Sequence, residues 1–301
     1  MTGGGLGRPT HQAGRDTEVN EEHEAGPDAT GQVAPQPAAI EVRAVSVAFG
    51  GLAALTDVSA SVRADHIVAV IGPNGAGKST LLNAICGLVP KKNGEVRHYG
   101  ADVTTAHPTR IARSGVGRSF QDPRLIDSAS VLENVLCGAH TTIGYSLADQ
   151  LVRRLKVAGR ERRAKAEARE LLDLCGLAHL ADVEAGRLAY GPRKMVDIVR
   201  ATVSRPNVLL LDEPSSGLGL AERARVQDML VTIHEEFRIP MLVVEHHMDL
   251  VRAVAHRVLG LVSGTVALTG PTEAVLDSEE FRATMTGGTP DVGRKVVSDH
   301  A

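Results

Sequence analysis

A glycine-rich run of the form Gly-x-x-x-x-Gly-Lys-Ser occupies residues 72–80, as Gly72-Pro73-Asn74-Gly75-Ala76-Gly77-Lys78-Ser79-Thr80. Residues 67–71 before it are continuously apolar and rich in β-branched side chains, which is typical of a strand buried on both faces. The residues after it predict a helix, because apolar side chains share one face at Leu81, Leu82, Ile85 and Leu88. A strand, a glycine loop and a helix in this order surround a polyphosphate with backbone N–H groups. The sequence therefore predicts an α/β fold with a phosphate-binding loop.

Two side chains of the loop have predicted contacts. Lys78 is expected to reach the β- and γ-phosphates, and the Ser79 hydroxyl is expected to ligate Mg²⁺. The glycines let the backbone approach the phosphates because they carry no Cβ. The competing interpretation is a chance glycine turn, which the flanking strand and helix disfavour.

Composition limits the class of protein. Of the 301 residues, 43% are hydrophobic but only 2% are aromatic, so the core must be aliphatic. The net charge of −3 is not typical of a nucleic-acid binder, and we expect no such partner. The scattered cysteines indicate reduced thiols in the cytoplasm and not a disulfide framework, and they are Cys86, Cys137 and Cys175. No apolar run reaches the roughly 18 residues that cross a membrane, and no secretory signal is visible.

The domain organisation follows from changes in composition. Residues 1–39 are almost free of large apolar side chains, which predicts a disordered tail, and residues 286–301 predict a polar C-terminal tail. Residues 40–285 form one predicted domain, within which about 123–187 carries a helical pattern. Its first strand is expected to turn Ile40, Val42 and Ala44 inward by alternation.

Polar residues follow three predicted strands. Asp212 and Glu213 end an apolar strand, and we expect Asp212 to hold Mg²⁺ and Glu213 to act as general base. Gln121 follows another strand, where its amide oxygen meets the metal or orients water, unless it is a plain surface residue. Two adjacent histidines follow a third strand; neighbours face apart in extended chain, so only one can reach a γ-phosphate.

Two further features have two interpretations each. Leu188-Ala189-Tyr190-Gly191 precedes a helix predicted to begin at Pro192, and it is either an anion site or an ordinary loop. Phe49 ends a strand, where its ring either stacks on an adenine base or caps the strand.

The order of these features resembles an ABC-type ATP-binding cassette over roughly residues 40–285. The features are Phe49, the loop at 72–80, Gln121, Leu188 to Gly191, the strand that ends in Asp212 and Glu213, and the Glu245-His246 pair. Three stretches are similar, more narrowly, to the ATP-binding subunits of branched-chain amino-acid importers: Gly117 to Gln121 with Val131 to Val135, Leu188 to Gly191, and Glu245 to Val251. The resemblance implies a P-loop NTPase core with a mixed sheet, an antiparallel β subdomain and an inserted α-helical subdomain.

The resemblance also implies a ligand set. ATP and Mg²⁺ are the implied cofactors, with Ser79, Gln121 and Asp212 at the metal. The catalytic residues are Glu213 as general base, Gln121, and His246, which the family pattern favours over His247. The implied nucleotide contacts are Phe49, Gly72, Asn74, Gly75, Ala76, Gly77, Lys78, Ser79, Thr80, Leu188, Ala189, Tyr190 and Gly191.

The partners implied are a second cassette, integral membrane permease subunits and, indirectly, an extracytoplasmic solute-binding protein. Two cassettes associate head to tail, as a homodimer or a heterodimer, so that each completes the other's ATP site. In such an importer, ATP hydrolysis drives the permease. The cassette lies on the inner face of the membrane, and its implied contact with the permease is near Gln121 and residues 123–134.

Three positions depart from the common cassette pattern. Ala189 lacks the usual serine hydroxyl, whose loss removes about 1.5–3 kcal/mol of hydrogen bonding. Pro192 replaces a glutamine or acidic residue, and Gly219 stands where many cassettes have aspartate. These departures leave open a soluble regulatory ATP-binding switch as the alternative to an importer ATPase. A P-loop metabolite kinase would explain neither Leu188 to Gly191 nor His246.

Overall fold

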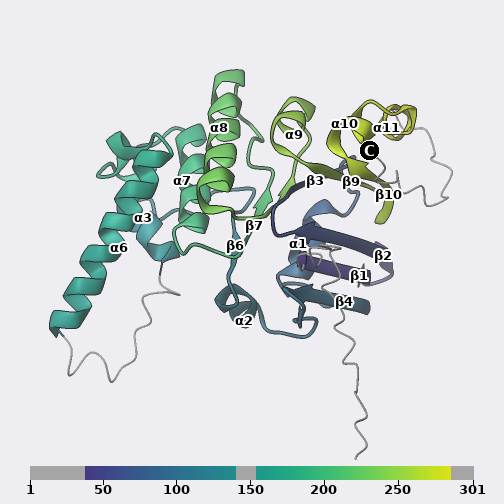
Figure 1. Ribbon diagram of the computed structural model, residues 1–301, viewed down its shortest axis with the longest axis horizontal. Coiled ribbons are helices and arrows are strands. Elements are labelled where there is room, and N and C mark those ends of the chain that lie inside the picture. The colour runs from purple at the N-terminus through teal and green to yellow at the C-terminus, as the bar shows by residue number, and fades with distance from the viewer. Residues whose placement is uncertain (1–37, 140–153, 286–301) are drawn as a thin grey trace, which may run out of the picture. The chain divides into compact units, whose positions relative to one another are not determined.

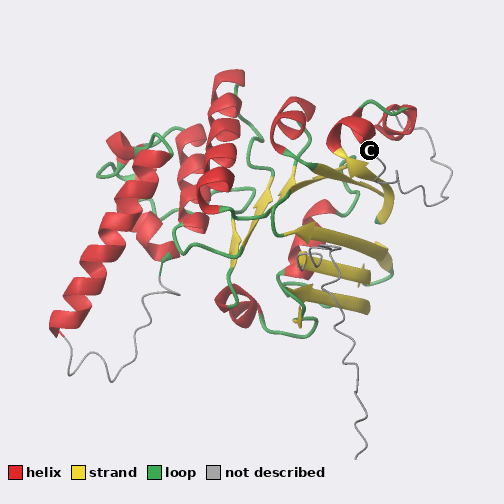
Figure 2. Cartoon of the chain, in the orientation of Figure 1, coloured by secondary structure: helices red, strands yellow, loops and turns green. Residues whose placement is uncertain are grey.

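The computed structural model describes residues 38–139 and 154–285 of the chain. The tails expected at residues 1–39 and 286–301 lie outside this part, except that Ala38 and Ala39 already belong to the first strand. The described residues form two β-sheets with helices packed against them (Figure 2). The predicted α/β fold is confirmed.

The larger sheet is mixed, as expected. Its strand order is β10-β9-β3-β8-β7-β6, and all neighbours are parallel except β10 with β9. The strands are β3 (Ile67–Ile71), β6 (Val116–Arg118), β7 (Val208–Asp212), β8 (Met241–Val244), β9 (Arg257–Val262) and β10 (Thr265–Pro271). The carboxyl ends of the parallel strands therefore meet at one edge.

Both faces of this sheet are buried. Along β7, Leu209 and Leu211 belong to a core shared with α7 (Tyr190–Thr202) and α8 (Leu220–Phe237), whereas Val208 and Leu210 belong to a second core shared with α1 (Lys78–Ile85) and the smaller sheet. Figure 1 shows α7 and α8 on one side of the larger sheet and the strands of the smaller sheet on the other. A strand with two buried faces needs an unbroken apolar run, which explains why alternation is absent there.

The smaller sheet has the order β2-β1-β4-β5 and forms the expected antiparallel subdomain. Its strands are β1 (Ala38–Phe49), β2 (Leu52–Arg63), β4 (Asn93–His98) and β5 (Ala101–Asp102). The prediction that Ala44 faces inward is wrong, because Ala44 is exposed with φ of 47° and Val45 is buried instead. An irregularity between Val42 and Val45 shifts the alternation, as a β-bulge does.

Helices lie between β6 and β7. Those within the region predicted to be helical, about residues 123–187, are α3 (Val131–Gly138), α6 (Arg154–Leu174) and the short η1 (Ala178–Leu180) and η2 (Ala185–Arg187), and α7 (Tyr190–Thr202) follows this region. Part of that region, residues 140–153, lies outside the described residues. α3 begins in a capping box, in which Ser130 and Glu133 bond each other's backbone N–H.

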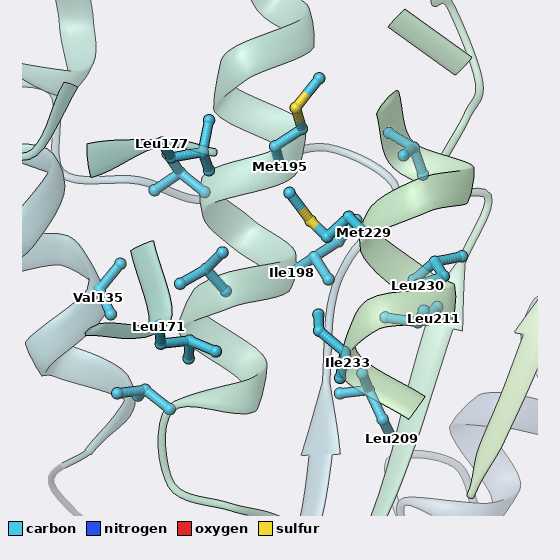
Figure 3. Close-up of a cluster of buried hydrophobic side chains, with 14 of the residues drawn as sticks. Val135, Leu171, Leu177, Met195, Ile198, Leu209, Leu211, Met229, Leu230 and Ile233 are labelled. Carbon is cyan, nitrogen blue, oxygen red and sulfur yellow. The ribbon is translucent and has the colours of Figure 1, made fainter. Parts of the chain in front are cut away.

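The helix α7 joins this helical region to the larger sheet. In Figure 3, Met195 and Ile198 of α7 lie between Leu171 of α6 and Met229 of α8. All four side chains are buried in one cluster. A displacement of α7 would therefore shift the side chains of both α6 and α8, because close-packed interiors transmit strain.

The other helices complete the two layers. They are α1 (Lys78–Ile85), α2 (Pro108–Arg113), α8 (Leu220–Phe237), α9 (Met248–Val254), α10 (Thr272–Leu276) and α11 (Glu279–Met285). Within residues 38–139 and 154–285, none of the helices combines the length and apolar character that a membrane span requires.

A buried histidine in β4 makes folding sensitive to acid. His98 is 5% exposed, and neither of its ring nitrogens has a hydrogen-bond partner in the described part of the chain. Burial, together with the charge of Lys91, lowers the pKa of His98 from 6.5 to about 4. The folded state thus keeps this ring neutral at a pH at which the unfolded chain takes up a proton.

We predict that His98→Leu reduces the loss of stability in acid. The depressed pKa contributes stability that is complete above pH 6.5 and is lost as the pH falls towards 4. Between about pH 7 and about pH 5, the free energy of unfolding should fall by about 2 kcal/mol less in the variant than in the wild type. Urea denaturation at the two pH values measures this difference. The exposed His179→Leu should follow the wild type, and parallel losses in all three proteins would refute the prediction.

Candidate functional site

Four polar segments meet at the carboxyl edge of the larger sheet. Residues 72–80 follow β3, Asp212 and Glu213 lie at the end of β7, Glu245 follows β8, and Gln121 lies shortly beyond β6. The strands β3, β8, β7 and β6 are consecutive and parallel, so these segments lie side by side. Residues that are far apart in the sequence are thus brought together, as predicted.

The glycine loop is tightly packed at two positions. Gly72 has φ of 147°, and a Cβ there would lie 2.1 Å from the carbonyl oxygen of Leu261. Gly77 has φ of 99°, and a Cβ there would lie 2.7 Å from the carbonyl oxygen of Ala54. α1 begins directly after Gly77, so the free N–H groups of its first turn belong to the loop.

The remaining loop residues differ in exposure. Asn74 and Gly75 are exposed at the tip of the loop, whereas Ala76 is buried and Thr80 is half-buried on α1. The carbonyl of Ala76 accepts a hydrogen bond of 3.1 Å from the N–H of Gly264. The turn between β9 and β10 therefore holds the loop at Ala76.

The Lys78 ammonium lies inside the loop. Lys78 is 6% exposed, and its Nζ donates to the carbonyl oxygens of Gly72 at 2.8 Å and Pro73 at 3.0 Å. Burial lowers the pKa of Lys78, and the carboxylates of Glu213 and Asp212 oppose this shift. An ammonium group has three N–H donors, so one remains for a further acceptor.

Ser79 and Asp212 lie together, as their predicted roles require. The Ser79 hydroxyl donates to Oδ1 of Asp212 at 3.1 Å, and a guanidinium nitrogen of Arg118 lies 3.6 Å from Oδ2. Burial raises the pKa of Asp212, while the bond from Ser79 and the charge of Arg118 lower it. A hydroxyl and a carboxylate are hard oxygen donors, and this pair fits Mg²⁺.

Glu213 is held in a strained backbone conformation. Its φ is 50°, in the left-handed region that costs a non-glycine residue about 1–3 kcal/mol. Its N–H donates to the Val244 carbonyl at 3.0 Å, and its own carbonyl accepts from Lys194 Nζ at 2.6 Å. Its Oε2 accepts from Nε2 of Gln121 at 3.1 Å. The structure therefore places Gln121 against the predicted general base.

Glu245 is a buried carboxylate with several donors. It is 0% exposed, and Oε1 accepts from the Ser215 N–H at 3.1 Å and from the Ser215 hydroxyl at 2.5 Å. Oε2 accepts from the N–H groups of His246 at 2.8 Å and His247 at 3.0 Å. A buried carboxylate needs such partners. Glu245 therefore connects Ser215, which follows Glu213 and Pro214, to the backbone of the two histidines.

The histidine rings do not face apart as predicted for an extended chain. Their centroids are 4.1 Å apart, because β8 ends at Val244 and His247 already caps α9. Nδ1 of His247 lies 2.7 Å from the Ser215 hydroxyl, whereas the ring of His246 is 43% exposed. The preference for His246 remains a prediction.

The segment Leu188 to Gly191 leads into α7. The prediction that Pro192 takes the first helical position is wrong, because α7 begins at Tyr190 and Ala189 is its N-cap. Proline is tolerated there because the N–H groups of the first turn have no intrahelical partner. Ala189 makes no side-chain capping bond.

This segment contacts the loop between β7 and α8. A Cβ on Gly217 would lie 3.1 Å from the Tyr190 ring, and a Cβ on Gly191 would lie 2.2 Å from a carboxylate oxygen of Glu222. Leu188 packs against the buried core. No hydrogen bond within the described residues joins this segment to the loop at 72–80. The contacts of this segment are instead with the loop after Glu213 and with the first turn of α8.

Phe49 ends β1, next to the turn into β2. Its partner across the hairpin is Leu52, and Phe49 is 49% exposed. The exposed ring is accessible to a base, and its role in stacking remains a prediction.

Sequence reasoning assigned no role to three buried contacts of the site. These are made by Arg118, Lys194 and Ser215. A signal existed for Lys194, because it lies one helical turn before Ile198, on the face of α7 predicted to be buried. A charged residue on such a face requires a polar partner.

Known proteins are similar to this chain in both sequence and fold. A family model described as ABC transporter matches residues 55–216. The chain is 31% identical over 241 residues to the high-affinity branched-chain amino acid transport ATP-binding protein BraF of Pseudomonas aeruginosa, covering 80% of this chain and 94% of BraF. It is 36% identical over 230 residues to the phosphonates import ATP-binding protein PhnC of Nitratidesulfovibrio vulgaris, covering 75% of this chain and 84% of PhnC.

Two solved structures are similar to this fold. The ADP conformation of MJ1267, an ATP-binding cassette of an ABC transporter, has a TM-score of 0.69 and 28% identity over 82% of this chain and 98% of that one. The dimeric structure of MJ0796, a bacterial ABC transporter cassette, has a TM-score of 0.66 and 25% identity over 77% of this chain and 98% of that one. Together with the loop, the strand-end carboxylates and the segment before α7, these matches show that the chain belongs to the ABC transporter family of ATP-binding cassettes.

Proposed function

We propose that this chain is the ATP-hydrolysing subunit of an ABC importer and couples ATP binding and hydrolysis to transport through membrane permease subunits. The observation that carries the proposal is the meeting of Lys78, Ser79, Asp212 and Glu213 at one sheet edge. An ammonium group, a hydroxyl and two carboxylates around a glycine loop match the needs of phosphoryl transfer to water.

Nucleotide binding uses groups of the loop and of β1. The backbone N–H groups of residues 72–80 and the Lys78 ammonium bind the β- and γ-phosphates, and Phe49 stacks on adenine. Ser79, Asp212 and Gln121 would hold Mg²⁺, Asp212 through a bound water. The metal, when bound, neutralises charge on the phosphate oxygens.

Hydrolysis uses the groups beside the loop. Glu213 accepts a proton from the attacking water, and Gln121, bonded to Glu213 at 3.1 Å, orients that water. His246 donates to a γ-phosphate oxygen from the neighbouring strand end. Buried Glu245 positions this histidine through its backbone N–H.

A second cassette completes the ATP site. Leu188 to Gly191 make no hydrogen bond to their own phosphate loop, which supports a role at the loop of a partner cassette. The N-terminus of α7 then meets the γ-phosphate there, and backbone N–H groups replace the hydroxyl that Ala189 lacks. The permease would bind this chain near Gln121 and residues 123–134, at the inner face of the membrane, and a solute-binding protein would deliver the solute on the outer side.

The solutes proposed are branched-chain amino acids or related small molecules. The similarity to BraF over 94% of its length supports this choice, together with the segments Gly117 to Gln121 and Glu245 to Val251. The similarity to PhnC makes phosphonates the competing class. Uptake of labelled leucine and of a labelled phosphonate, by vesicles that hold the reconstituted complex, distinguishes the two.

We predict that Lys78→Ala weakens ATP binding at least about tenfold, because it removes a charged donor from the phosphates. Titration of the purified chain with ATP in a calorimeter measures the affinity. Lys91→Ala is the matched control, since Lys91 donates to the Ala84 carbonyl at the opposite end of α1. Equal affinities for Lys78→Ala and wild type would rule out the proposed phosphate site.

We predict that Glu213→Gln lowers ATP turnover about a hundredfold or more and stabilises an ATP-bound dimer, because the general base is lost while binding is kept. Phosphate release and light scattering, with the permease subunits present, measure the two effects. Glu236→Gln, on the exposed end of α8, should behave as wild type. Wild-type turnover no faster than that of Glu213→Gln would favour the regulatory switch over the importer.

A further inference from the structure

A buried lysine joins α7 to the backbone of the proposed general base. Lys194 is 2% exposed, and its Nζ donates to the carbonyl oxygen of Glu213 at 2.6 Å. The same ammonium lies 5.5 Å from the centroid of the Tyr190 ring. One side chain thus lies near the first residue of α7 and bonds the residue after β7.

Burial disfavours the charged form of Lys194, and nearby carboxylates partly compensate for this. Burial lowers the pKa of Lys194, and four carboxylates oppose the shift, belonging to Glu245, Glu213, Asp122 and Asp197. A buried charge is retained only where partners compensate for the lost hydration. An apolar side chain would pack in α7 without this requirement, so helix packing alone does not explain a lysine here.

The bond from Lys194 lies at a strained point of the backbone. Glu213 has φ of 50°, and bonds restrain it on both sides, from its N–H to Val244 and to its carbonyl from Lys194. A strained residue keeps its conformation only when its surroundings hold it. The direction of the Glu213 carboxylate depends on this conformation.

Two further contacts run parallel to this one. The Tyr190 ring packs against Gly217, and the Glu222 carboxylate packs against Gly191. The first contact joins the start of α7 to the loop that follows Glu213, and the second joins it to the first turn of α8. Of these three contacts, the hydrogen bond from Lys194 is the one made to Glu213 itself.

We propose that Lys194 is a positioning residue that holds the backbone of Glu213 in its left-handed conformation and links the proposed base to the segment Leu188 to Gly191. This inference rests on the proposed function, in which that segment binds the ATP of the partner cassette. Binding of the partner's ATP by this segment then orients this chain's own Glu213. Occupancy of one ATP site therefore affects the orientation of the general base at the other.

The test compares Lys194→Met, Lys194→Gln and Lys194→Arg in the full chain with its permease subunits. Misplacing the base should lower kcat about ten- to a hundredfold in Lys194→Met, with KM for ATP and the affinity for ATP changed less than about threefold. Lys194→Arg keeps a charged donor and should restore most of kcat. Lys194→Gln keeps a neutral, shorter donor and should fall between the two.

Arg193→Met is the matched control, because Arg193 is the neighbouring cation on α7 but bonds Asp127 and the Ala185 carbonyl instead. Its kcat should stay within about twofold of the wild type, because its contacts do not reach Glu213. Should Lys194→Met fail to fold, the order of kcat in Lys194→Arg and Lys194→Gln still decides. Wild-type kcat in Lys194→Met, or an equal loss in Arg and Gln variants, would overturn the inference. A wild type without turnover dependent on Glu213 would instead contradict the proposed function.

Discussion

Burial of the parallel strands on both faces determines where this protein can carry polar chemistry. β3, β7 and β8 are buried along their whole lengths. β7 and β8 place alternate side chains in two cores, and β3 divides its side chains between these cores and a third buried cluster. Polar groups are excluded from these strands by the cost of desolvation, except at their ends. The carboxyl ends coincide because the strands are parallel, so the phosphate loop, Asp212, Glu213 and Glu245 share one edge.

Each buried charge at this edge has a polar or charged partner. Glu245 accepts from Ser215 and both histidine N–H groups, Lys194 donates to Glu213, and Arg118 lies beside Asp212. Each ion is costly by itself and is stabilised by its partners. Removing one partner would leave the other without compensation. Two other groups of the site, Gln121 and the ring of His246, are exposed.

The position of α7 gives the site a mechanical connection to the helical region. Its apolar face packs between α6 and α8, while its first turns contact Gly217, Glu222 and Glu213. The same helix presents Ala189 to Gly191 at its N-terminus. In the proposed dimer, the helix that meets the partner's phosphate is therefore also the helix that supports the chain's own base.

Local signals in the sequence predicted the buried strands, the loop and the candidate carboxylates, because unbroken apolar runs and the Gly-x-x-x-x-Gly-Lys-Ser spacing need no knowledge of distant residues. The same signals failed at Ala44, Pro192 and the two histidines, where a bulge, the freedom of a helix's first turn and an early strand end change the local geometry. The bonds of Gln121 to Glu213 and of Lys194 to the Glu213 carbonyl became visible only in the folded chain. Those contacts join residues far apart in the chain, and their partners follow from strand order and helix packing, which no local pattern encodes.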